Sequence, residues 1–186
     1  MLHPRYLWSR YHGVLMGLVI ALAITSCSTA PPVGIHPVKP FDLNRYLGTW
    51  YEIARLDHRF ERGLTDIQAV YSLRDDGSVK VLNRGRQTEN GEWREAEGRA
   101  LFTGSANEAS LKVSFFGPFY GGYHVAALDP QYQWALIVGP DRDYFWILSR
   151  SPHISDALRH SLIDRAKAFG IQTDALIWTP QNAKTP

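Results

Sequence analysis

The chain has 186 residues, of which 45% are hydrophobic, with 20 lysine and arginine residues against 18 aspartate and glutamate residues. This length suits one domain with a single core. The slight positive charge comes from Arg5 and Arg10, and the residues from 27 onward carry 18 basic and 18 acidic side chains. Because this balance gives no electrostatic basis for it, nucleic-acid binding is not expected.

The first 26 residues have the layout of an export signal. Two arginines precede an uncharged run at residues 13–25, and small residues follow at Thr25 and Ser26. The run is shorter than the roughly 18 to 20 apolar residues that a helix needs to cross a bilayer. A cleaved signal peptide over residues 1–26 is therefore preferred to a permanent transmembrane span.

Cys27 is the only cysteine of the chain. The run Ile24–Cys27 resembles the lipobox of bacterial lipoproteins, in which the cysteine sulfur carries a lipid and the cleaved, acylated cysteine becomes the N-terminus. The alternative is an ordinary signal peptide with an incidental free thiol, which is a liability in an oxidising compartment. Cys27 is therefore the predicted lipid-attachment residue. Because Ser28 and not aspartate follows it, the resemblance implies sorting to the outer membrane.

Residues 27–40 are predicted to form a tether. The segment after Cys27 contains four prolines, Gly34 and no apolar periodicity. Such a composition is typical of an extended spacer that lifts a domain off a surface.

The residues that follow are typical of short strands separated by turns. Turn dipeptides such as Asn90-Gly91, Asp129-Pro130 and Gly139-Pro140 stand between runs of apolar and alternating residues. Eight strands are predicted at 50–55, 67–73, 78–82, 93–103, 111–116, 123–128, 134–138 and 144–149.

This pattern predicts an all-β fold with one C-terminal helix. Eight sequential strands with short turns favour an antiparallel up-and-down barrel, which has no exposed edges and room for one small ligand. Helical spacing of apolar residues predicts a helix over about 154–169 that ends at Gly170. A ninth short strand is expected at 175–179, so the barrel domain spans 41–180 and 181–186 form a tail.

Three motifs carry a resemblance to a known family. Gly48–Glu52 (GTWYE), Gly139–Tyr144 (GPDRDY) and Arg150 are similar in order and spacing to the three signatures of the lipocalins. Over residues 41–178 the chain looks like the bacterial outer-membrane lipocalins, the branch that includes relatives of apolipoprotein D. The resemblance implies a periplasm-facing outer-membrane lipoprotein that binds fatty acids or lysophospholipids and serves envelope maintenance under stress. Some members of the family are homodimers.

The lipocalin signature implies a plugged barrel end. Because strand residues alternate between faces, Trp50, Glu52 and Ala54 are expected to face inward together. The resemblance implies that Trp50 closes one end and that Arg150 lies over it as a cation–π pair. Gly48, Trp50 and Arg150 are therefore interpreted as structural residues.

Candidate ligand contacts follow from the same alternation. Counted back from Arg150, Leu148, Trp146 and Tyr144 are expected to line the cavity. On the preceding long strand, the family's alignment puts Tyr123, Val125 and Ala127 inward. Such walls suit an acyl chain, although these side chains can equally be ordinary packed core.

The loop between the predicted fifth and sixth strands is the expected headgroup site. The run "GPFYGGY" has three glycines and one proline and carries Tyr120 and Tyr123. A tyrosine at the mouth can hydrogen-bond a phosphate or ester, or face an ammonium group. A loop that only turns is the alternative. Arg59 and Arg62 are a second candidate contact, against the simpler interpretation of a solvated loop.

The sequence gives little support for catalysis. The single cysteine is assigned to the anchor, the histidines have no metal-site spacing, and the serines lack a hydrolase motif. No metal, cofactor or enzyme activity is therefore predicted. Two alternatives remain, a lipocalin-fold enzyme acting on a lipid through Glu52 or a histidine, and a structural envelope lipoprotein.

Overall fold

The computed structural model describes residues 28–182. The predicted signal peptide, Cys27 and the end of the C-terminal tail lie outside these residues. The elements are α1 (Leu43–Tyr46), β1 (Gly48–Arg55), β2 (Leu64–Leu73), β3 (Val79–Gln87), β4 (Trp93–Phe102), β5 (Ser110–Phe116), β6 (Phe119–Leu128), β7 (Trp134–Val138), β8 (Phe145–Ser149), α2 (Asp156–Ala168), the 3-10 helix η1 (Thr173–Ala175) and β9 (Ile177–Trp178).

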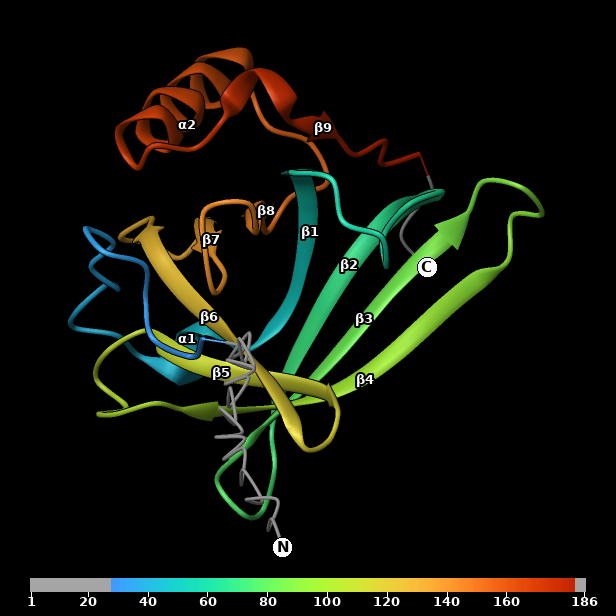
Figure 1. Ribbon diagram of the computed structural model, residues 1–186. Coiled ribbons are helices and arrows are strands. Elements are labelled where there is room, and N and C mark those ends of the chain that lie inside the picture. Colours follow the sequence, from blue (N-terminus) through green and yellow to red (C-terminus); the bar gives the residue numbers. More distant parts are fainter. Residues whose placement is uncertain (1–27, 183–186) are drawn as a thin grey trace, which may run out of the picture.

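The first eight strands form a closed antiparallel barrel. Each strand pairs with the next from β2 to β8, β8 pairs with β1, and β1 pairs with β2 to close the ring (Figure 1). The short β9 adds outside the ring beside β1. The predicted eight-stranded barrel with one main C-terminal helix is therefore confirmed.

Successive connections alternate between the two ends of the barrel. We call the end with α1 and the β2–β3, β4–β5 and β6–β7 connections the closed end. The opposite end, with the β1–β2, β3–β4, β5–β6 and β7–β8 connections, is the open end. These names are used below for all residues at either end.

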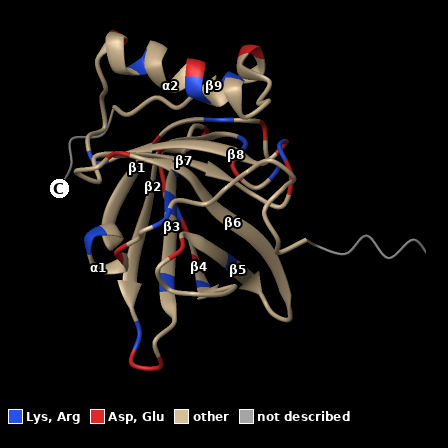
Figure 2. Ribbon diagram, turned by 90° about the vertical axis from the view of Figure 1, so that its left-hand side faces the viewer, with Lys and Arg blue, Asp and Glu red and all other residues tan. Residues whose placement is uncertain are grey.

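Helix α2 covers one outer face of the barrel, above β1, β7 and β8 (Figures 1 and 2). Its Leu162 and Ala166 are fully buried against strand residues such as Leu136 and Phe145. The Ser155 side chain caps the helix by accepting a hydrogen bond from the backbone N–H of Leu158. No helix within residues 28–182 has both the length and the apolar run needed to cross a membrane.

Two β-bulges change which residues face inward. In β1 the register with β8 shifts between Glu52 and Ala54, and in β6 the register with β7 shifts between Val125 and Ala127. The extra residue reverses the alternation, so Ala54 and Ala127 pack in the outer cluster under α2. The expectation that these two alanines face the cavity is therefore wrong, whereas Trp50 belongs to the interior cluster.

Residues 28–40 lie along the barrel and do not extend away from it. The carbonyl oxygen of Ser28 accepts from the Gly122 N–H at 3.1 Å, and the Val38 N–H donates to the Val125 carbonyl at 2.9 Å. Between them, the Ile35 side chain is buried in the outer cluster. The proline-rich composition of residues 28–40 did not predict these long-range contacts.

Candidate ligand-binding site

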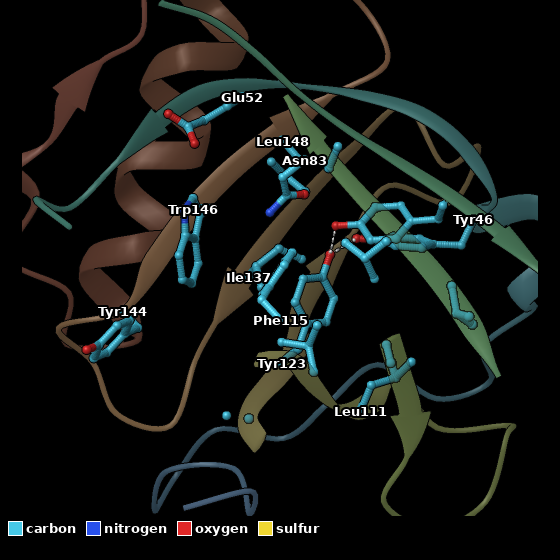
Figure 3. A pocket seen from close by; sticks show the side chains of 18 of the residues that line it. Tyr46, Glu52, Asn83, Leu111, Phe115, Tyr123, Ile137, Tyr144, Trp146 and Leu148 are labelled. Carbon is cyan, nitrogen blue, oxygen red and sulfur yellow. Dashed lines mark hydrogen bonds between the residues drawn. The ribbon is translucent and has the colours of Figure 1, made fainter. Parts of the chain in front are cut away.

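The barrel encloses an apolar cavity of about 310 Å³. This volume falls within the size range of small-molecule sites, roughly 300 to 1,000 Å³. Aliphatic and aromatic side chains together form most of the wall. The aliphatic ones come from several strands and include Ile67, Val79, Ala100, Leu111, Ile137 and Leu148, of which Figure 3 labels the last three. Because the aliphatic parts of the wall need no directional partner, the cavity suits a hydrocarbon chain.

The closed end is sealed by Trp50 and Arg150. The Trp50 side chain is fully buried, and the guanidinium carbon of Arg150 lies 3.9 Å from its ring centroid. The Arg150 guanidinium also donates to the carbonyl oxygens of Thr49 at 2.7 Å and Leu47 at 2.9 Å. Gly48, between them, has a φ of 92°, a backbone conformation that favours glycine. These residues therefore hold the plug in place.

Three tyrosine hydroxyls meet inside the cavity, near its closed end (Figure 3). The Tyr123 hydroxyl lies 2.7 Å from that of Tyr46 and 2.9 Å from that of Tyr71. Burial raises the pKa of Tyr71 to about 12 and the pKa of both Tyr46 and Tyr123 well above 10. All three hydroxyls therefore stay neutral and satisfy one another at the floor of the cavity.

Two glutamates and one arginine form a buried polar cluster in the wall towards the open end. Because of the β1 bulge, Arg55 faces inward, where its guanidinium donates to Glu52 Oε1 at 2.9 Å. Its Nε lies 3.7 Å from Glu61 Oε2. The Thr179 hydroxyl also donates to Glu52. Two carboxyl groups thus share one positive charge.

The shared charge decides which carboxyl group is ionised. Burial, aided by the charge of Glu52, raises the pKa of Glu61 to about 9. Burial also raises the pKa of Glu52, against the effects of Arg55 and Thr179. Glu52 has the closer partners, so it is the first of the two carboxyl groups to ionise, and Glu61 keeps its proton at pH 7. The indole N–H of Trp146 donates to Glu61 at 3.1 Å.

Aromatic rings stack beside Glu61 at the mouth. The His58 ring lies between those of Phe60 and Tyr144, at centroid distances of 5.3 and 4.8 Å, and 4.7 Å from Trp146. Burial, with a smaller contribution from Arg55, lowers the pKa of His58 to about 4. His58 is therefore neutral at pH 7, and its ring packs behind those of Tyr144 and Trp146, which line the mouth.

Two further polar side chains, Gln68 and Asn83, line the cavity, and Gln68 already accepts hydrogen bonds from Arg84. Asn83 lies in β3, and its Oδ1 atom is buried without a hydrogen-bond partner among the described residues (Figure 3). A buried amide oxygen without a partner is destabilising unless a ligand or water donates to it. Asn83 is therefore a candidate contact for a ligand hydroxyl group.

The structure brings four of the six predicted ligand contacts to the cavity wall. These are Tyr123, Tyr144, Trp146 and Leu148. The Tyr123 hydroxyl lies at the floor of the cavity beside Tyr46 and Tyr71, so the expectation that it contacts a headgroup at the mouth is wrong. Val125 is fully buried in the interior cluster but does not line the cavity.

The other predicted headgroup contacts lie elsewhere. Tyr120 is outside the cavity lining, and its ring lies 5.0 Å from the Lys112 ammonium. Arg62 is exposed and pairs with Asp57, and Arg59 is also exposed. Neither arginine is brought to the cavity wall.

Glu52 lines the cavity as expected, but Arg55, Glu61 and Asn83 were missed from the sequence. Arg55 and Glu61 meet only because of a bulge and a loop, neither of which has a distinctive sequence signal. Asn83 had a readable signal, because it directly follows the predicted strand 78–82 and continues the alternation of Val79 and Val81. Within residues 28–182, no three His, Cys, Asp or Glu side chains are grouped so as to hold a metal ion.

A closed barrel with one plugged end and an apolar cavity defines a class of protein that holds a small ligand inside a cup. The comparisons agree with this class. The Lipocalin-like domain family matches residues 41–181. The chain therefore belongs to the lipocalin family.

Its relatives include bacterial lipoproteins. The chain is 54% identical over 162 residues to outer membrane lipoprotein Blc of Escherichia coli strain K12, covering 87% of this chain and 92% of that protein. The corresponding Citrobacter freundii protein is 53% identical over 169 residues, covering 90% and 96%. Insecticyanin from the tobacco hornworm Manduca sexta shares the fold, with a TM-score of 0.64, 24% identity and coverage of 82% and 86%.

These relatives also indicate the cellular compartment of the protein. The chain is a lipid-anchored protein of the outer membrane. It is a lipocalin of the bacterial envelope whose cavity suits a lipid.

Proposed function

We propose that this protein binds one fatty acid or lysophospholipid inside the barrel and stores or transports it for maintenance of the outer membrane, especially under stress. In this proposal the anchor is an acylated Cys27. The activity is binding and not catalysis, without a cofactor.

One observation carries the proposal, namely an apolar cavity of about 310 Å³ that is closed at one end. Each methylene group that enters such a cavity contributes roughly 0.8 kcal/mol without needing a directional partner. A single acyl chain therefore binds well, with its methyl end towards the tyrosine floor. Chain length is selected weakly, since one methylene discriminates by only about 1 to 3 kcal/mol.

The polar groups favour a ligand with a neutral polar segment after its tail. Glu61 keeps its proton at pH 7 and presents a neutral carboxyl group to the part of the ligand that carries its ester, and Asn83 Oδ1 can accept from a hydroxyl. A lysophospholipid carries both an ester and a free hydroxyl. Its headgroup then lies among Phe60, Tyr144 and Trp146 at the mouth.

Native mass spectrometry of the purified mature protein, with identification of the copurified molecule, tests the proposal. We expect about one acyl lipid per chain, and the same spectrum reports whether the protein is a homodimer. A protein that carries no lipid, and that takes up none when lysophospholipid is added, would refute it.

A pair of variants tests the assigned contacts. We expect Trp146→Ala to weaken lysophospholipid binding by roughly 1 to 3 kcal/mol, the usual result of truncating a buried aromatic contact. Tyr120→Ala is the matched control, because its ring lies outside the cavity lining, and its affinity should remain that of the parent protein. Titration calorimetry measures both. Equal affinities for the two variants would remove the site assignment while leaving the cavity assignment intact.

A further inference from the structure

One polar side chain of the cavity wall is left without a partner. Within residues 28–182, six buried side-chain nitrogen or oxygen atoms have no hydrogen-bond partner, and Asn83 Oδ1 is the one among them that belongs to a residue of the wall. The other buried polar side chains of the wall bond to the protein itself. The tyrosine hydroxyls bond one another, Gln68 accepts from Arg84, and Glu61 accepts from Trp146.

The position of Asn83 in the sheet explains why the protein supplies no partner. Its neighbours on the paired strands are Ala69 of β2 and Ala96 of β4. The next residues on its own face of β3 are Val81 and Gly85. None of these residues has a side chain that donates or accepts a hydrogen bond. The Asn83 amide is therefore left to bond with whatever occupies the cavity.

Asn83 lies half-way along the cavity wall. It is the central residue of β3, and it is two residues, or about 7 Å, nearer the open end than Val81, which pairs with Tyr71 of the floor. Figure 3 shows the amide between Trp146 on the mouth side and Tyr46 on the floor side. A ligand whose headgroup lies at the mouth therefore places its acyl chain beside Asn83.

A hydroxyl group is the small polar group that fits this amide. The amide oxygen needs a donor, which an ester or ether oxygen cannot supply, whereas a hydroxyl can donate to Oδ1 and also accept from Nδ2. Because the terminal amide has two nearly equivalent orientations, either atom can face the ligand. A plain methylene chain leaves the amide unpaired, and a charged donor costs far more to bury in an apolar wall.

We propose that Asn83 selects acyl ligands that carry a hydroxyl group on the hydrocarbon chain, and that this hydroxyl donates to Asn83 Oδ1. The ligand is then a hydroxylated fatty acid or a lysophospholipid with a hydroxylated chain. The selection rests on the function proposed above, because it requires an acyl chain in the cavity. The glycerol hydroxyl of a lysophospholipid has the same chemistry, but it reaches Asn83 only if the ester passes below the mouth.

A series of positional isomers tests the proposal. Octadecanoic acid and its derivatives with one hydroxyl, placed at successive positions from the third to the twelfth carbon, compete with a fluorescent fatty acid bound to the purified mature protein. We expect the affinity to pass through a maximum along the series, about fivefold to tenfold above that of octadecanoic acid, because one depth brings the hydroxyl to Asn83. At other positions the hydroxyl is buried without a partner, so those acids should bind more weakly than octadecanoic acid.

Asn83→Leu removes the amide and keeps a side chain of similar size. The maximum should disappear in this variant, and octadecanoic acid should bind at least as tightly as to the parent protein, because an unpaired amide has left the wall. Asn83→Ala should also lose the maximum, which covers a change of cavity shape caused by leucine. Val81→Ala is the matched control on the same face of β3, and it should keep the maximum.

Stability separates a ligand contact from a structural role. In urea unfolding without ligand, Asn83→Leu should be at least as stable as the parent protein, since an apolar group replaces an unpaired buried oxygen. A large loss of stability with an unchanged affinity series would show that Asn83 only supports the fold, and it would overturn the proposal.

The remaining outcomes distinguish this proposal from the proposed function. Equal affinities throughout the series would remove Asn83 as a selective residue and leave the proposed function intact. A lysophosphatidylethanolamine analogue without its glycerol hydroxyl, if it bound less tightly than its parent lipid to the unmodified protein but equally to Asn83→Leu, would move the contact to the glycerol and overturn the chain assignment. Binding of no acid and no lysophospholipid would refute both proposals.

Discussion

The two ends of the barrel differ in how well their polar groups are paired. At the closed end the Arg150 guanidinium donates to several backbone carbonyls and covers Trp50, and the three tyrosine hydroxyls bond one another. At the open end, His58 Nε2 is buried without a partner among the described residues, and Glu52 and Glu61 share Arg55.

This difference indicates a division of roles within one small domain. The closed end gains stability because its buried groups are paired and closely packed. The open end carries exposed aromatic rings and a carboxyl group with a raised pKa, features that lower stability and are typical of binding sites. Substitutions at the closed end should therefore change mainly stability, and those at the open end mainly ligand binding and pH dependence.

The largest effect is expected for Trp50→Ala. The side chain is fully buried, packs against Tyr46 and Arg150, and donates its indole N–H to the Tyr46 carbonyl at 2.8 Å. Removing it should lower the free energy of unfolding by about 3 to 5 kcal/mol, since both transfer and cavity terms are lost. Urea unfolding followed by circular dichroism measures this loss.

The open-end variant Trp146→Ala is the comparison for this measurement. Its side chain is only partly buried, so it should be destabilised less than Trp50→Ala while losing more ligand affinity. An equal loss of stability at both positions would contradict the division between the two ends.

Features that depend on short-range sequence patterns were predicted correctly. The strand order, the barrel and the helix that stops just before Gly170 follow from turn dipeptides and from periods of two and 3.6 residues. The inward orientation of Tyr144, Trp146 and Leu148 follows from the same alternation, because the strand near them is short and has no bulge in its pairing with β7.

Features that depend on contacts between distant residues were not predicted. A bulge adds one residue without a sequence signal, so Ala54 and Ala127 were placed on the wrong face. Glu61 reaches Arg55 because the β1–β2 loop folds back over the mouth. Its pKa depends on burial and on Glu52, neither of which a sequence pattern measures.

The next largest effect concerns the pH dependence of stability. The pKa of Glu61 is about 9 in the folded protein and 4.5 ordinarily, so between these values folded Glu61 retains a proton that the unfolded chain has lost. Stability should therefore fall as pH rises from 7 to 9, by up to about 1.4 kcal/mol per pH unit. Glu61→Gln should abolish this decline.

Urea unfolding at pH 7, 8 and 9 measures the slope. This window avoids His58, whose lowered pKa of about 4 makes stability rise with pH only up to about its ordinary value of 6.5. Glu95→Gln replaces an exposed glutamate of β4 and should keep the slope of the parent protein. The same slope in both variants would show that Glu61 is already ionised at pH 7.

The smallest effect is expected for Tyr71→Phe, at the cavity floor near the closed end. The substitution removes one hydroxyl and its hydrogen bond to Tyr123 but leaves the bond between Tyr46 and Tyr123, so the free energy of unfolding should fall by only about 0.5 to 1.5 kcal/mol. Because the hydroxyls bond one another, lipid affinity should change by less than about twofold. Urea unfolding and titration calorimetry measure the two quantities, with Tyr120→Phe as the control outside the cavity. A loss of affinity without a loss of stability would place the lipid's polar group at the tyrosine floor and reverse the orientation of the ligand in the barrel.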